Sequence, residues 1–104
     1  DTEIVRLCAE KIMGWTGGPP SNDWWGPDKE FHWATWSPIT SDADWMALVD
    51  RMVELEHHVD VEFWPDAVYV TIDRLPMTVL PSYSPENRRR VTVTACLRAV
   101  GVEI

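Results

Sequence analysis

The sequence lacks the features of a membrane-spanning protein, a secreted protein or a metal-binding protein. It includes only two cysteines, Cys8 and Cys96, without the short spacing that metal sites need. Both lie on apolar faces of predicted helices, which favours buried free thiols over a disulfide and fits a reducing cytosol. The longest apolar runs stay far below the roughly 18 residues of a membrane-spanning helix. The charged N-terminal stretch is unlike a secretory signal, so we expect neither feature.

Basic residues are also scarce. The chain has 9 Lys and Arg residues against 17 Asp and Glu, which gives a formal net charge of −8. Duplex nucleic acid is bound through clustered cations that neutralise phosphates, so we expect no duplex DNA or RNA partner. The main basic cluster is Arg88-Arg89-Arg90. These arginines could pair with the surplus carboxylates, or their guanidinium forks could bind a phosphate at the amino end of a helix.

The overall composition is that of one small globular domain. A hydrophobic fraction of 45% and a charged fraction of 25% are ordinary for a folded chain, and 104 residues suffice for one core. We therefore expect a single domain over residues 1–104. A core this small, beside several aromatic side chains that cannot all be buried, favours self-association into a homo-oligomer.

Tryptophan is the residue type that the sequence has in excess. Five of the seven tryptophans lie between Gly14 and Trp36, around the turn-forming stretch GGPPSND at residues 17–23. Glycine and proline argue against a helix or a central strand in that stretch. Trp24 and Trp25 are adjacent, so only one of them can face inward if the segment is extended. The exposed one, together with Trp33, could stack on a flat ligand or pack against a neighbouring subunit.

Three helices are predicted, at residues 2–13, 41–56 and 84–100. The second has apolar residues at helical spacing, which places Trp45 in the core. Its start, Ser41 with Asp44 three residues on, resembles a capping box. The third begins with Ser84 as a suitable N-cap and Pro85 at the first helical position, although it contains a β-branched run that would also suit a strand.

Strands are predicted at residues 31–36, 57–64 and 67–73. The first places Phe31 and Trp33 on one face and His32 on the other. The second and third alternate apolar and polar residues around a Pro-Asp turn, which is typical of an antiparallel hairpin with one face in water. Residues 75–82 contain two prolines, so they can form at most an irregular or edge segment.

No catalytic motif is evident. The chain has neither a G-x-S-x-G elbow, a phosphate-binding loop nor an H-E-x-x-H pair. His58, Asp60 and Glu62 alternate on one predicted strand face, where they could bind a metal or move a proton. The polar face of a half-exposed hairpin explains the same alternation without any site. We therefore expect no enzyme activity, no catalytic residues, no metal site and no cofactor.

Three segments resemble the phage ABA sandwich domain family. Residues 7–15, LCAEKIMGW, resemble that family's AEKVMGW opening. Residues 36–45, WSPITSDADW, look like the FSPST…AW start of its central helix, and residues 95–101, ACLRAVG, are similar to its AICxAxLxAxG C-terminal helix. The order and spacing of the three agree with the family over nearly the whole chain, although residues 88–92 depart from its alanine-rich pattern.

The resemblance implies a bacteriophage protein of the α+β class. The expected architecture is a small alpha-beta-alpha sandwich, with an antiparallel sheet and about three helices. A phage protein of this kind would act in the host bacterial cytoplasm. The family brings no established catalytic residues, so the resemblance predicts architecture rather than activity.

Two functional hypotheses follow. In the first, a small phage-encoded binding protein sequesters a nucleotide-like immune second messenger, such as a cyclic nucleotide or an ADP-ribose-type ligand, and so acts as an anti-defence sponge. The ligand-binding residues would be Trp24, Trp25 and Trp33 by stacking, and Arg88, Arg89 and Arg90 through phosphate. In the second, a phage interaction protein binds and inhibits a bacterial host protein without catalysis, with the tryptophans as interface anchors.

Overall fold

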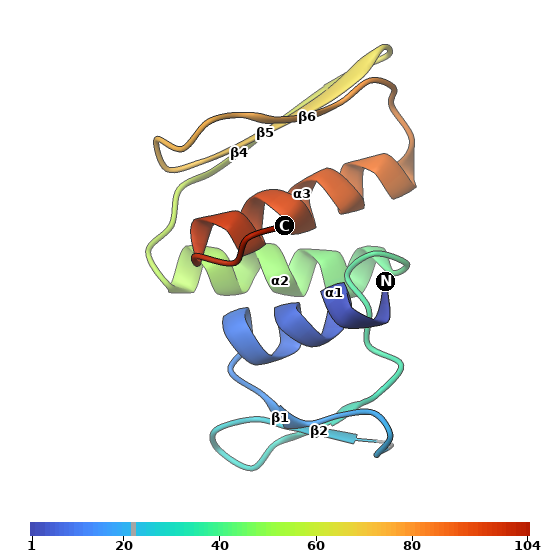
Figure 1. The fold of residues 1–104 in the computed structure, drawn as a ribbon, viewed down its shortest axis with the longest axis vertical. Helices are drawn as coiled ribbons and strands as arrows, with labels where there is room; N and C mark the ends of the chain where they lie inside the picture. Colours follow the sequence, from blue (N-terminus) through green and yellow to red (C-terminus); the bar gives the residue numbers. More distant parts are fainter. Residues whose placement is uncertain (22) are drawn as a thin grey trace.

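The chain folds into helices that lie between two small sheets. In the computed structural model, which describes residues 1–21 and 23–104, each sheet has three antiparallel strands. We call β1–β2–β3 the tryptophan sheet and β4–β5–β6 the hairpin sheet. Figure 1 shows them at opposite ends of the longest axis, with the helices between them. The prediction of an α+β domain with three helices and antiparallel strands is confirmed.

The layer order differs from that of the expected alpha-beta-alpha sandwich. The helices do not cover the two faces of one sheet; they form the middle layer, and each sheet covers one side of them. The physical reason is that each sheet is narrow and needs only one face covered. The outer face of each sheet therefore remains open.

The first helical segment changes its pitch midway. The α-helix α1, Thr2–Leu7, continues as a π-helical turn, η1, Cys8–Ile12, in which the Met13 N–H donates to the Cys8 carbonyl over 3.0 Å. Gly14 then adopts φ 76°, a left-handed conformation that ends the helix. The N–H of the next residue, Trp15, donates to the Ala9 carbonyl over 2.9 Å.

The two long helices begin at the predicted caps. In α2, Asp42–Glu54, the Ser41 hydroxyl accepts from the Asp44 N–H over 3.2 Å. The Asp44 carboxylate completes no capping box, because it accepts instead from the Ser37 N–H over 2.9 Å. In α3, Pro85–Ala99, the Ser84 hydroxyl accepts from the Asn87 N–H over 2.9 Å. The β-branched run in α3 is helical, as predicted, and does not form a strand.

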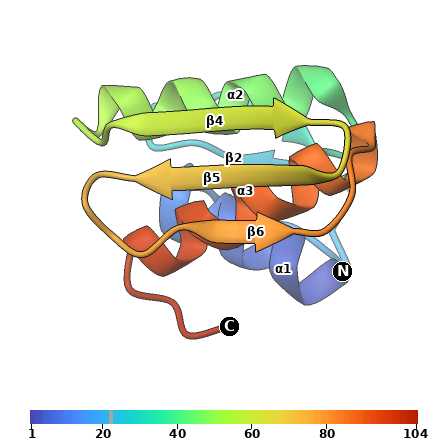
Figure 2. The ribbon, with the colours of Figure 1, turned by 90° about the horizontal axis from the view of Figure 1, so that it is seen from above.

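The hairpin sheet lies over α2 and α3 (Figure 2). Strands β4, Val59–Trp64, and β5, Ala67–Ile72, pair in the register Val61↔Val70, which confirms the predicted hairpin. Among the strands that the structure describes, β6, Thr78–Leu80, pairs with β5 alone and forms the expected edge segment. The apolar side chains of β5 that face inward are buried: Val68, Val70 and Ile72.

The tryptophan sheet corrects the expectation for the loop. Strands β1, Thr16–Gly17, and β2, Asp23–Trp25, were not predicted, and Asp23 opens the central strand of this sheet. Strand β3 covers only Phe31–Trp33, because a turn begins at Ala34. The missed strands are too short to show a sequence period, and tertiary contacts of Trp24 define them. The predicted turn position Asn22 lies outside the described residues.

One core joins the helices to both sheets. It includes Trp15, Trp24 and Trp36 from the tryptophan-rich stretch, and Trp45 is only half-buried, contrary to its expected place in the core. Cys8 and Cys96 are buried free thiols, as predicted. Among the described residues, no helix has the length and apolar character needed to cross a membrane.

Candidate functional site

Three aromatic side chains stand exposed on the outer side of the tryptophan sheet. Trp25, Phe31 and Trp33 expose 42%, 42% and 67% of their surfaces, and we call them the aromatic face. Trp25 pairs with Phe31 across the strands, so all three side chains lie on one face by alternation. Their rings meet edge to face, with centroids 5.6 Å apart for Trp25–Phe31 and 4.8 Å for Phe31–Trp33.

The same alternation sends the neighbouring side chains inward. Trp24 is 1% exposed, and its strand partner His32 stacks on Trp15 with ring centroids 3.9 Å apart. One of the adjacent tryptophans, Trp24, is therefore buried and the other, Trp25, is exposed, as the sequence predicts. The inward residues anchor the sheet on the helices and hold the aromatic face in a fixed position.

Trp24 fits under the sheet because residue 18 has no side chain. Gly18 has φ 78°, and a Cβ atom there would stand 2.3 Å from the Trp24 ring. The Arg6 guanidinium lies 5.8 Å from the centroid of the Trp24 ring, within the range of a cation–π contact. Arg6 also donates to the Pro19 carbonyl, which ties the turn to α1.

A cavity of ≈ 300 Å³ opens beside Trp24. It lies between α1, the Pro19 turn and the segment from Ala34 to Thr40. Asp1, on its rim, accepts hydrogen bonds from Arg90 over 3.0 and 2.7 Å. Two of the predicted ligand-binding residues thus lie at this cavity. Trp24 forms a buried part of its wall, and Arg90 lies beside it, bound to the Asp1 carboxylate.

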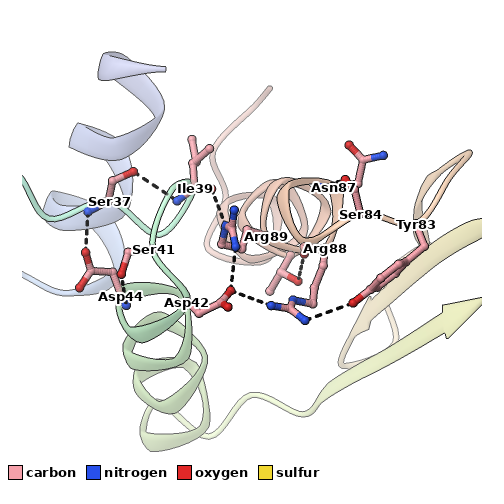
Figure 3. A network of polar contacts seen from close by, with 11 residues as sticks. Ser37, Ile39, Ser41, Asp42, Asp44, Tyr83, Ser84, Asn87, Arg88 and Arg89 are labelled. Carbon is pink, nitrogen blue, oxygen red and sulfur yellow. Dashed lines mark hydrogen bonds and ion pairs between the residues drawn. The ribbon is translucent and has the colours of Figure 1, made fainter.

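The arginines at the start of α3 are held by an aspartate of α2 (Figure 3). Arg88 and Arg89 both donate to the same oxygen of Asp42, over 2.7 and 2.8 Å. Arg89 also donates to the Ile39 carbonyl over 2.6 Å. Arg88 donates to the Tyr83 hydroxyl over 3.3 Å. The network couples the starts of the two long helices.

Arg88 is also enclosed by aromatic rings. Its guanidinium carbon lies 5.1 Å from the centroid of Trp45 and 5.8 Å from that of Phe63. Hydrogen bonds from Arg88 and then Arg89 hold the pKa of the Asp42 carboxyl below its usual 3.8, and the bond to Asp42 raises the pKa of Arg88. Both groups therefore stay charged at neutral pH and remain bound to each other.

The imidazole and carboxylate groups in and beside the hairpin sheet form two separate pairs. His57 contacts Asp73 over 2.7 Å and His58 contacts Asp60 over 3.1 Å. The hydrogen bond with His57, followed by that from the His58 N–H, holds the pKa of Asp73 below its usual 3.8. Within residues 1–21 and 23–104, no group of three or more His, Cys, Asp or Glu side chains could hold a metal ion.

The six predicted ligand-binding residues do not form one site. They occupy three places: Trp25 and Trp33 on the aromatic face, Trp24 beneath it, and Arg88, Arg89 and Arg90 on α3. The segment containing α1 lies between α3 and the tryptophan sheet (Figure 1). Of the alternatives for the arginines, the structure shows pairing with carboxylates. Sequence reasoning did not select Phe31 or Asp42, although Phe31 shares the predicted face of Trp33 and could have been found from that alternation.

Comparison with known proteins adds no assignment. No family model matches the sequence, and no match was found among curated proteins or solved structures. The resemblance to the phage ABA sandwich family, and the bacteriophage origin that it implies, therefore stay predictions.

Proposed function

We propose that this chain is a non-catalytic binding protein that docks its aromatic face on another protein. The observation that carries the proposal is the set of three exposed, mutually packed rings on a sheet that is anchored from beneath. Large aromatic side chains are enriched at the centres of protein interfaces, where burying them contributes most of the binding free energy. Because the rings pack edge to face, the three side chains are held in place and lose little conformational entropy on binding.

The charge of the chain favours a basic partner. Asp23 pairs with Trp33 across the strands and so lies on the same outer side as the aromatic face, and Asp28 and Glu30 are in the adjoining turn together with one lysine, Lys29. The net charge of −8 acts in the same direction over longer distances. Under the phage hypothesis, the partner would be a bacterial host protein that this chain binds and inhibits in the host cytoplasm.

Nucleotide capture has less support from the geometry. Arg88 and Arg89 are bound to Asp42, and Arg90 is bound to Asp1, so a phosphate would have to displace a carboxylate from each. The stacking residues Trp25 and Trp33 lie on another layer of the molecule. Capture of a second messenger stays a prediction, and it requires a site other than the one expected from the sequence.

The test compares two tryptophan variants in partner binding. The double variant Trp25→Ala/Trp33→Ala removes most of the aromatic face, and Trp64→Ala is the matched control, because Trp64 is 54% exposed on the opposite sheet. Immobilised protein is first used to capture a partner from bacterial lysate, and the Kd of the purified pair is then measured. We expect the double variant to bind about 100-fold or more weakly, since two hot-spot rings are lost.

Trp64→Ala should bind like the parent chain. Absence of any stoichiometric protein partner, or equal binding by the double variant, would contradict the proposed function. A second copy of this chain is the other possible occupant of the aromatic face. Sedimentation equilibrium of the parent chain and of the double variant tests for it. A dimer that the double variant abolishes would assign the face to the expected homo-oligomer instead.

A further inference from the structure

The aromatic face has a carboxylate beside its most exposed ring. Asp23 pairs with Trp33 across β2 and β3, so the two side chains leave the sheet on the same side. Directly opposed residues have Cβ atoms about 4.5–5.5 Å apart, which places the carboxylate next to the indole. The Ser21 hydroxyl donates to one oxygen of Asp23. In the part of the chain that the structure describes, no Lys, Arg or His side chain forms an ion pair with Asp23.

No cation of the described residues lies over the aromatic face. Residues 1–21 and 23–104 contain three cation–π contacts, which join Arg6 to Trp24 and Arg88 to both Trp45 and Phe63. All of these rings lie outside the aromatic face. Its exposed rings can therefore accept a cation from a partner, because indole and phenyl faces carry negative electrostatic potential.

The chain already contains the arrangement that such a cation would complete. At the start of α3, the Arg88 guanidinium carbon lies 5.1 Å from the Trp45 centroid, and Nη2 donates to Asp42 over 2.7 Å. One guanidinium thus contacts an indole and binds a carboxylate at the same time, which its planar shape allows. Trp33 and Asp23 present the same two groups side by side, but without an arginine.

Arginine suits this pair of groups better than lysine does. A guanidinium can stack on an indole while its N–H groups, which lie in its own plane, donate to a carboxylate. A lysine ammonium is a compact and strongly hydrated charge, so it loses more hydration free energy on an apolar ring. The net charge of −8 attracts both cations over longer distances and does not distinguish between them.

We infer that the partner of the aromatic face places an arginine side chain on Trp33, with the guanidinium bound to Asp23. The inference rests on the function proposed above and names the chemical group that the aromatic face recognises. Both binding groups are held in place before the partner arrives. Phe31 packs edge to face against Trp33, and Ser21 donates to Asp23. A preformed site of this kind loses little conformational entropy when the arginine binds.

The probe is the capped tripeptide Gly-Arg-Gly, titrated into the intact chain and followed by NMR of the backbone amides and indole N–H groups. The control peptides replace arginine by lysine, which has the same charge, or by citrulline, which has a similar shape without the charge. We expect the arginine peptide to shift signals of β2 and β3 but not that of Trp64, and to bind about threefold or more tightly than the lysine peptide. The citrulline peptide should cause no saturable shift.

Two variants assign the binding groups. Asp23→Asn keeps the size of the side chain and an acceptor for Ser21 but loses the charge, so we expect about threefold or more weaker binding of the arginine peptide. Trp33→Ala removes the ring and should weaken binding about fivefold or more. Asp66→Asn is the matched control, because Asp66 is an exposed carboxylate in the turn of the opposite sheet. It should bind the peptide as the parent does, and melting curves show that each variant is folded.

The inference is overturned if the arginine peptide causes no shift confined to β2 and β3, or if the lysine peptide binds as tightly. Equal losses in Asp23→Asn and Asp66→Asn would also overturn it, because general attraction to an acidic chain would then explain the binding. A protein captured through the aromatic face, with no response to the arginine peptide, would refute arginine recognition but support the proposed function. A localised response to the peptide without any captured protein would support arginine recognition and refute the proposed function.

Discussion

Gly18 determines whether Trp24 can lie beneath the tryptophan sheet. A methyl group at this position would overlap the indole ring, and the backbone has φ 78°. We expect Gly18→Ala to lower the free energy of unfolding by about 2–5 kcal/mol, through overpacking and left-handed strain together. Urea unfolding followed by tryptophan emission measures this change.

Gly14→Ala is the matched control for backbone strain. Gly14 has φ 76°, but a Cβ atom there would meet nothing within 4 Å. This variant should lose only the strain contribution, about 1–2 kcal/mol. Equal losses in the two variants would show that the contact between Gly18 and Trp24 does not limit the packing of the sheet.

At the scale of elements, Asp42 links the amino ends of α2 and α3. Because its pKa is lowered in the folded chain by Arg88 and then Arg89, its contribution to stability is present above the unfolded value of 3.8. The contribution is lost as pH falls through the lower, folded pKa. We expect Asp42→Asn to be less stable than the parent at pH 7, and the difference to shrink progressively below about pH 4.

Urea unfolding at a series of pH values checks this prediction. Asp50→Asn provides the control, because Asp50 is an exposed carboxylate on the same helix. A constant difference between Asp42→Asn and the parent from pH 7 to pH 2 would contradict the linkage. The same series tests whether Arg88 and Arg89 stabilise the fold, as their hydrogen bonds to Asp42 indicate.

The elements differ in how well the sequence predicts them. The two long helices could be predicted because their caps are local: Ser41 and Ser84 each bond to a backbone N–H three residues ahead. The tryptophan sheet could not, because strands of two or three residues carry no period and their register depends on the burial of Trp24. The partner of Arg88 could not be predicted either, since Asp42 lies 46 positions away in the chain.

The candidate site was predicted only in part, for the same physical reason. Exposure of either Trp24 or Trp25 followed from strand alternation alone. The choice between them depends on Gly18, which is a contact between a turn and a ring rather than a local pattern. Sequence reasoning therefore found Trp25 and Trp33 of the aromatic face, but neither Phe31 nor the inward orientation of Trp24.

At the scale of the whole molecule, the two thiols report on the integrity of the core. Burial raises the pKa of Cys8 to about 12, with a further contribution from Cys96, and burial alone raises the pKa of Cys96 to about 12. The thiolate is the reactive form, so neither thiol should react with an aromatic disulfide reagent at pH 8 in the folded chain. Both should become reactive together as urea unfolds the protein.

The midpoint of thiol labelling should coincide with the midpoint followed by tryptophan emission, as expected for a single cooperative core. Cys8→Ala and Cys96→Ala assign the signal to each thiol. Rapid labelling of either cysteine without urea would show that the helical layer opens on its own, and would contradict a core shared by all the helices.

The central position of the helices has a geometric consequence for assembly. The chain measures 40 × 25 × 22 Å, and its two sheets stand at opposite ends of the long axis. A partner on the aromatic face and a second partner on the hairpin sheet would be held apart by a packed helical layer rather than by a flexible linker. Two ligands joined by a linker could then bind at the same time only if the linker spans that fixed separation. The protein would therefore act as a molecular spacer that selects for the length of the linker.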